Sequence, residues 1–216
     1  MNDQAETSNK EAPAIQAETE VVSVAKDLQE ALGVYFISEG SALTRQGKVL
    51  KNMDRIESVN TRMEKRVIAH VRSWQVARML RRDFNLFSSH LFFRMIKATI
   101  EEKRAIEQLI GEILAQATVL TFAVKEIPGV VIDETFDVET IPVRLVSRET
   151  SYLYRAITNL DEPLVRLESA YRRSVLSREE FREIVRPGRE AYTDLRTVIF
   201  DSNWQLATES SINALR

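Results

Sequence analysis

The side chains best suited to chemistry in this sequence are basic, and they gather in its first half. Residues 40–110 carry fifteen bases and seven acids, although the whole chain has a net charge of −2. Lysines and arginines in such a block can neutralise the phosphates of a nucleic acid and release its counterions. The candidate contacts are Arg78, Arg81 and Arg82. The alternative is a solvated helix face whose charge is balanced by acids elsewhere in the chain.

Patterns for catalysis or metal binding are weak. His70 and His90 are the two histidines, and they do not form an H-E-x-x-H motif. The chain has no cysteine, which excludes disulfides and thiolate metal sites. It also lacks a P-loop, a G-x-G-x-x-G fingerprint and a G-x-S-x-G elbow. We therefore predict that the protein is not an enzyme and binds no metal or cofactor.

The composition favours a cytoplasmic protein. Hydrophobic residues make up 44% of the chain and charged residues 29%, which is ordinary for a protein that buries a core. No run reaches the roughly 18 apolar residues of a membrane span. The first twenty residues lack the basic and apolar regions of a signal peptide. We expect cytoplasmic localisation without membrane contact.

Most of the chain has a helical pattern. Residues 1–20 are polar and acidic, which predicts a disordered tail, and residues 21–216 are expected to form a single helical domain. Apolar residues at threes, fours and sevens predict one helix over 44–84. A second helix is predicted to start at Ser88 or Ser89 and to end at residue 127, before Pro128. These two helices are expected to pair antiparallel.

One stretch, residues 137–146, alternates like a β-strand instead. Ile141, Val143 and Leu145 would face one side, while Thr140 and Arg144 would face the other. Proline at 142 fits an edge strand, because it cannot donate to a ladder. A lone strand needs a partner for its backbone groups. That partner could be residues 130–136 in a hairpin, or the same strand of a second copy.

The segments that follow the strand have clear helix signals. Ser147 looks like an N-cap, and Asp161 looks like the N-cap of a helix over 163–176. Ser177 and Glu180 form a capping-box pattern. The Arg-Pro-Gly at 186–188 is expected to break or kink that last helix. The first helix is predicted to turn inward Tyr152, Leu153, Ala156, Ile157 and Leu160.

A strand followed by two helices, over about residues 138–176, is the layout of a ribbon-helix-helix unit. In such a unit two chains pair their strands into a ribbon that enters the DNA major groove. Thr140 and Arg144 would then meet base edges. Free N–H groups at the helix start near Asp161 would approach a phosphate. Arg148, at the start of the first helix, is included among the predicted DNA contacts.

The C-terminal region also resembles a known family. The elements concerned are Ser147, then Leu160, Asp161, Leu164, Val165 and Arg166, then Leu176, Ser177, Glu180 and Phe181, and finally Arg189, Tyr192, Leu195 and Arg196. They resemble the C-terminal half of the AcaB family, which is encoded on conjugative plasmids and integrating conjugative elements. "LTR" at 43–45 is similar to an N-terminal element of that family. The resemblance covers roughly the last 80 residues and implies a ribbon-helix-helix activator of transfer genes.

Together these observations predict a mostly α fold with one short β-strand that forms an intersubunit ribbon in a homodimer. The expected function is sequence-specific binding of double-stranded DNA by a transcriptional regulator of conjugative transfer genes, most simply an activator. The alternative is a helical scaffold or partner-binding protein of a mobile genetic element. The partner of the strand distinguishes the two.

Overall fold

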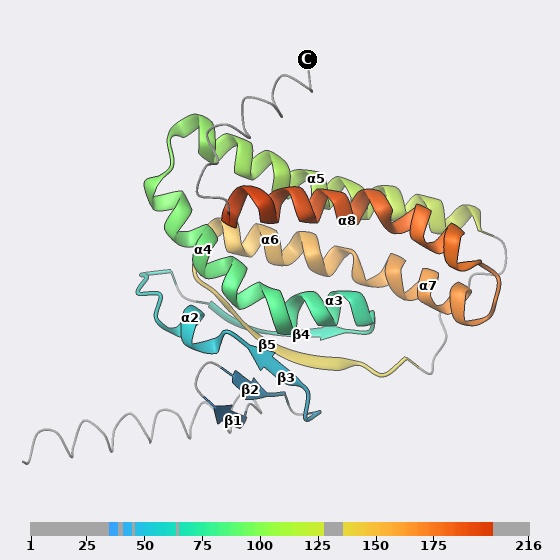
Figure 1. Cartoon of the computed structure of the whole chain (residues 1–216), viewed down its shortest axis with the longest axis horizontal. Coiled ribbons are helices and arrows are strands. Elements are labelled where there is room, and N and C mark those ends of the chain that lie inside the picture. The colour runs from blue at the N-terminus through green and yellow to red at the C-terminus, as the bar shows by residue number, and fades with distance from the viewer. Residues whose placement is uncertain (1–34, 39–40, 45, 64, 128–135, 201–216) are drawn as a thin grey trace, which may run out of the picture.

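Long helices dominate the molecule and lie on one side of a small β-region (Figure 1). The computed structural model describes residues 35–38, 41–44, 46–63, 65–127 and 136–200. The mostly α class predicted from the sequence is confirmed. The predicted disordered tail, residues 1–20, lies outside the described residues.

The predicted helix over 44–84 is wrong in its first two thirds. A three-stranded antiparallel sheet leads into this region, formed by β1 (Tyr35–Ser38), β2 (Ser41–Leu43) and β3 (Val49–Lys51). Within 44–84 the chain forms β3, the short helix α2 (Met53–Glu57) and a further strand at 65–71 before a longer helical segment begins at Trp74. Gly47, with a φ of 72°, lies in the turn between β2 and β3. This left-handed conformation suits glycine and ends any helix that starts at Thr44.

The lone strand of the sequence finds its partner in its own chain. β4 (Lys65–Val71) pairs antiparallel with β5 (Glu139–Leu145) over seven residues, from Lys65 opposite Leu145 to Val71 opposite Glu139. The predicted intersubunit ribbon is therefore wrong. β4 supplies the partner for one edge of β5, and its β-branched Val67, Ile68 and Val71 suit a strand. Because β5 is paired within its own chain, it gives no reason to expect a homodimer.

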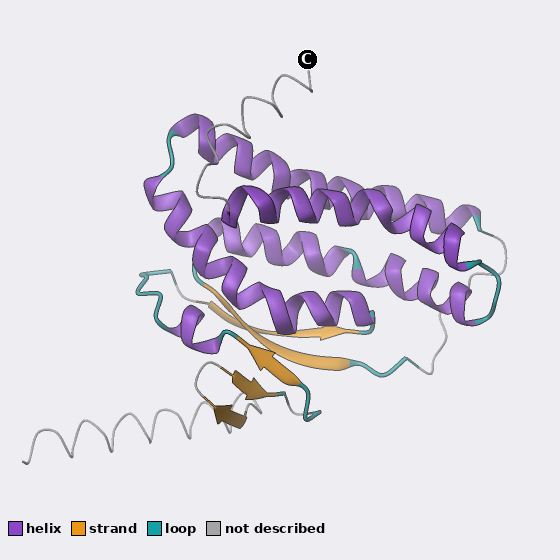
Figure 2. Cartoon of the chain, viewed as in Figure 1, coloured by secondary structure: helices purple, strands orange, loops and turns teal. Residues whose placement is uncertain are grey.

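Both faces of β5 are covered. Ile141, Val143 and Leu145 are buried in the main core beneath the helices. On the other side α2 and β1–β3 lie beneath β4 and β5 (Figure 2). A second small cluster forms there around Ile56 and Val146. The strand is thus an interior element of the fold.

The helices begin immediately after β4. α3 (Trp74–Arg78) continues through a π-helical turn, η1 (Met79–Asp83), into α4 (Phe84–Lys97). The predicted helix over 88–127 is two helices, because α5 (Ile100–Glu126) begins anew at Thr99, which forms a capping box with Glu102. Ser88 and Ser89 are not caps; both are buried inside α4.

Three further helices complete the layer: α6 (Arg148–Asn159), α7 (Asp161–Arg172) and α8 (Arg178–Phe200). The predicted cap at Ser147 is confirmed, because its hydroxyl accepts a hydrogen bond from the Thr150 N–H. The Arg-Pro-Gly at 186–188 was predicted to break or kink the last helix; α8 continues through Pro187, so it does not break there. Tyr152, predicted to point inward, is 39% exposed.

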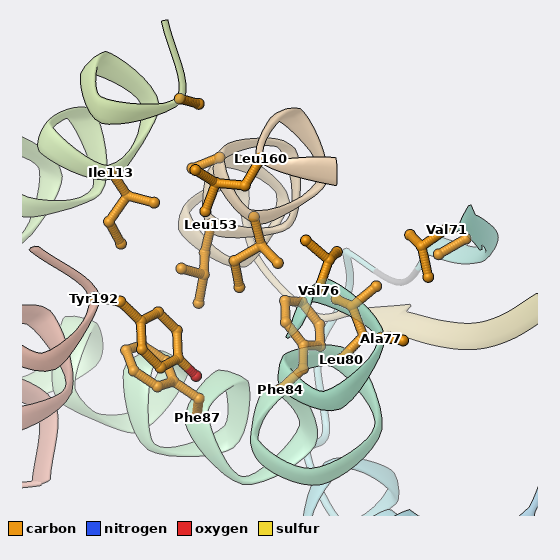
Figure 3. Packing of buried hydrophobic residues seen from close by; sticks show 14 of the residues in the cluster. Val71, Val76, Ala77, Leu80, Phe84, Phe87, Ile113, Leu153, Leu160 and Tyr192 are labelled. Carbon is orange, nitrogen blue, oxygen red and sulfur yellow. The ribbon is translucent and has the colours of Figure 1, made fainter. Parts of the chain in front are cut away.

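The core lies where α4 to α8 meet the β4–β5 sheet. Figure 3 shows side chains of α3, α4, α5 and α6 converging, with Tyr192 of α8 beside Phe87. The stripe predicted along α5 is confirmed from Ile106 to Val124, whereas Ile96 and Ile100 are exposed. Each fully buried leucine or isoleucine contributes about 1.5–3 kcal/mol. α8 runs antiparallel to α5 (Figure 1), and Gly188 faces Leu120 at their contact.

Candidate functional site

An open cleft of about 470 Å³ lies between two helical walls. One wall is α3 with η1, the other is α8, and Tyr171 of α7 stands at one end. Four arginines line it, and we call it the arginine cleft after them: Arg78, Arg178, Arg182 and Arg189.

The sequence of α8 places its arginines on the cleft. Arg178, Arg182 and Arg189 are separated by four and seven residues, and such spacings lie on one helical face. Ser177 starts the helix through the predicted capping box: its hydroxyl accepts from the Glu180 N–H at 3.2 Å, and its own N–H donates to the Glu180 carboxylate at 2.8 Å. The cleft residues of α8 run to Thr193, or about 22 Å along the helix axis.

The cleft is locally basic. All four of its arginines are exposed, and no carboxylate among the described residues lies within ion-pair distance of them. Asp83 is the acidic side chain in the lining. Arg186 of α8 is not part of the cleft lining, and it differs from these four because its guanidinium lies 2.8 Å from the Glu183 carboxylate. Guanidinium groups without acid partners favour an anionic ligand.

Aromatic rings lie at one end of the same cleft. Trp74 is 53% exposed and Tyr171 is 43% exposed, which are high values for such large apolar groups. The Tyr171 ring packs on Phe181, with 5.4 Å between the ring centroids. Open aromatic faces beside arginines can stack on the planar bases of a nucleic acid.

A buried polar corner fixes the start of α3 and with it Trp74. The Ser73 hydroxyl donates to Glu168 Oε1 at 2.8 Å, and the Trp74 N–H donates to Glu168 Oε2 at 3.3 Å. The Asp161 carboxylate accepts from the backbone N–H groups of Arg72 and Ser73. Burial raises the pKa of Glu168 to about 7, and the hydrogen bonds that Glu168 accepts from Ser73 and Trp74 offset part of this rise. Burial also raises the pKa of Asp161.

The three arginines predicted to form one basic cluster are separated. Arg78 lines the cleft. Arg81 turns toward the sheet, where its Nε lies 2.5 Å from the carboxylate of Glu139, a buried residue that also pairs with Lys48. Arg82 is exposed, and its carbonyl accepts from Asn52. One of the three therefore belongs to the cleft.

The predicted base-reading face of β5 is not assembled. Arg144 is 8% exposed, so the prediction that it is free to meet base edges is wrong. Its guanidinium donates to the carbonyls of Ile56 and Val59 and lies 3.8 Å from the Glu57 carboxylate. The side chain ties α2 and the following loop to β5. Thr140 is half-buried and stands opposite His70 in the ladder.

The remaining predicted contacts have local roles. Arg148 is exposed and lies over the Tyr152 ring, with its Nε donating to the phenol oxygen at 3.1 Å. Asp161 is the first residue of α7 and does not cap that helix, contrary to prediction; Leu160 occupies the cap position. Its carboxylate serves the start of α3 instead.

The sequence reading missed the arginines of α8. Their spacing was visible, with Phe181 and Tyr192 interleaved on the same face. An amphipathic helix that carries arginines and aromatics together was the available signal. The opposite wall was not predicted, because the sequence pattern places the residues of α3 inside one long helix over 44–84.

Other kinds of site have less support in the described residues. No group of three or more histidine, aspartate or glutamate side chains there could hold a metal ion. In the same part of the chain, no helix is both long and apolar enough to cross a membrane.

Comparison with known proteins supports the fold. No protein-family model matches the chain, and no curated protein matches it in sequence. Among solved structures, selenomethionine-containing AcaB from uropathogenic E. coli matches it with a TM-score of 0.52 and 18% identity, over 64% of this chain and 78% of that one. The resemblance to AcaB seen in the sequence is thus confirmed at the level of the fold, and this chain shares a distant AcaB-like architecture.

Proposed function

We propose that the protein binds DNA in the arginine cleft and regulates the transcription of conjugative transfer genes. The observation that carries the proposal is the set of four exposed guanidinium groups, without acid partners among the described residues, beside the exposed ring of Trp74. The AcaB-like fold supports the link to transfer genes. In this proposal the protein binds DNA rather than catalysing a reaction, and it acts in the cytoplasm.

A polyanion fits this cleft better than a small anion does. Arg178 and Arg189 lie eleven residues apart on one helix, or about 16 Å, and Arg78 stands on the facing wall. One phosphate or carboxylate cannot engage groups spread over that length. A nucleic-acid backbone presents a phosphate at each step, so several arginines can be satisfied together.

The mechanism differs from the one that the sequence suggested. A ribbon-helix-helix protein reads bases with an exposed two-stranded ribbon. Here β5 is interior and Arg144 holds backbone carbonyls. The contact surface of the proposal is therefore the helical cleft, and activation of the transfer genes follows from DNA binding there.

Salt-dependent binding to promoter DNA tests the proposal. The wild type and an Arg182→Ala/Arg189→Ala variant are titrated by fluorescence anisotropy against a fragment of the element's own transfer promoter and a scrambled fragment. Each lost phosphate contact should reduce the slope of log K against log salt by about 0.9. The double variant should therefore lose up to about 1.8 of that slope.

Arg186→Ala is the matched control, because Arg186 lies on α8 but is ion-paired away from the cleft. It should bind DNA nearly as the wild type does. A wild type that binds neither fragment at low salt, or an equal loss in the control and the double variant, contradicts the proposal. A wild type without preference for the promoter contradicts its regulatory part.

One observation favours the scaffold function as a second candidate. α4 and α5 expose several large apolar side chains, namely Phe93, Ile96, Ile100, Val119 and Phe122. Large exposed apolar side chains can serve contacts between proteins where they lie together. The two functions are separated by the titration above, because a scaffold needs no affinity for DNA.

A further inference from the structure

We infer that the DNA in the arginine cleft is an unpaired stretch of strand, with a base stacked on Trp74. This inference deepens the proposed function and rests on it. It names the form of DNA that the cleft recognises, and it follows from the shape of the cleft and the position of its aromatic rings.

The cleft is hollow, and this shape is unfavourable for reading a duplex. Proteins that read duplex DNA insert a protruding helix or β-ribbon into the major groove. The arginine cleft is instead the space of about 470 Å³ between α3–η1 and α8, so it receives a ligand rather than protruding into one. A duplex could touch the rim of this cleft, but its stacked bases could not enter.

The aromatic side chains provide the second argument. Trp74 and Tyr171 are exposed, although the backbone N–H of Trp74 is held by the buried Glu168. In a duplex the faces of the bases are covered by their neighbours, so these rings would gain nothing from it. An unpaired base has a free face, and stacking of a base on an aromatic ring contributes about 1–3 kcal/mol to the binding of a single strand.

The order of residues along the two walls supports one path for the strand. Trp74 lies beside Glu168 of α7, and Tyr171 packs on Phe181, so the start of α3 faces the start of α8. Arg178 and Arg182 therefore stand near the aromatic end. Arg78 and Arg189 lie further along the cleft. A base at the aromatic end thus has guanidinium groups along the path of its adjoining phosphates.

The side chains on the two walls also differ in their freedom to engage a ligand. The four arginines make no ion pair within the described part of the chain. Trp74 is fixed at its backbone, because its N–H donates to the buried Glu168 and Ser73 caps the helix behind it. The stacking platform is therefore held in place, while the long arginine side chains can follow the backbone of a flexible strand.

A comparison of three DNAs with one sequence tests this inference: the single strand, the full duplex, and the duplex with six mismatched central pairs. We expect the wild type to bind the single strand and the mismatched duplex at least tenfold more tightly than the full duplex. Trp74→Leu should weaken single-strand binding by about tenfold, since it removes one stacked base, and should leave duplex binding nearly unchanged. Trp74→Phe should restore part of the loss.

Phe122→Leu is the matched control, because Phe122 is also an exposed aromatic residue, 61% against 53% for Trp74, but lies on α5. It should leave all three affinities unchanged. Equal or tighter binding of the full duplex overturns the inference while leaving the proposed function intact. Failure to bind any of the three DNAs overturns both. Circular dichroism of each variant confirms that a loss of binding is not a loss of folding.

Discussion

Replacing Glu168 with glutamine tests the polar corner that positions Trp74. Glu168 is 2% exposed, and burial raises its pKa from 4.5 to about 7. A raised carboxyl pKa means that the folded state binds the proton more tightly than the unfolded state does. The contribution to stability is therefore complete below about pH 4.5 and is lost as the pH rises through about 7. Glutamine carries no charge at any of these pH values.

The size of the effect follows from the two pKa values. The difference between 4.5 and about 7 corresponds to about 3 kcal/mol in the free energy of unfolding. Between pH 5 and pH 8 the wild type should lose about 2.5 kcal/mol of this through Glu168. Asp161, whose pKa is also raised by burial, changes stability in the same direction in both proteins. It therefore cancels when the two proteins are compared.

Urea denaturation followed by circular dichroism, at pH 5 and pH 8, measures the difference. At pH 5 the two proteins should be of similar stability, because the folded Glu168 is then a neutral acid that, like the amide, offers one carbonyl oxygen to Ser73 and Trp74. At pH 8 the glutamine variant should be the more stable by about 2.5 kcal/mol, because the wild type then buries a charged carboxylate. Glu179→Gln, at an exposed glutamate of α8, is the control and should show no such change. A gap between wild type and Glu168→Gln that is the same at both pH values refutes the reasoning.

Two further predictions concern stability. Arg144→Ala should cost about 3 kcal/mol in the free energy of unfolding, because it leaves two buried backbone carbonyls without their donor. In the same urea titration the exposed Arg148→Ala should change stability by less than about 0.5 kcal/mol, and equal losses would contradict the interior role of Arg144. Ser177→Ala should cost about 1 kcal/mol through loss of the cap on α8. A thermal midpoint equal to that of the wild type would show that the reciprocal bonds with Glu180 contribute little.

Features that the sequence determined by itself are set by residues within a few positions of one another. The caps at Ser147 and Ser177 and the apolar stripe of α5 were predictable, since a cap bonds to an N–H three residues away and a helix repeats its face every 3.6 residues. The alternation of side chains predicted a strand at β5, and the structure has one there. Pro142 indicated that this strand lies at an edge. The mostly α class followed from these local patterns.

Tertiary structure alone decided which strand pairs with β5 and what the arginines contact. Lys65 and Leu145 are neighbours in the ladder but eighty residues apart in the chain. The segment 65–71 has apolar spacings that fit a helix as well as a strand, so local preference could not choose between them. Once β4 pairs with β5, the covered face of β5 takes Arg144 into the interior, and the helix that starts at Trp74 meets α8. The arginine cleft exists through that meeting of distant segments, which no spacing within either one encodes.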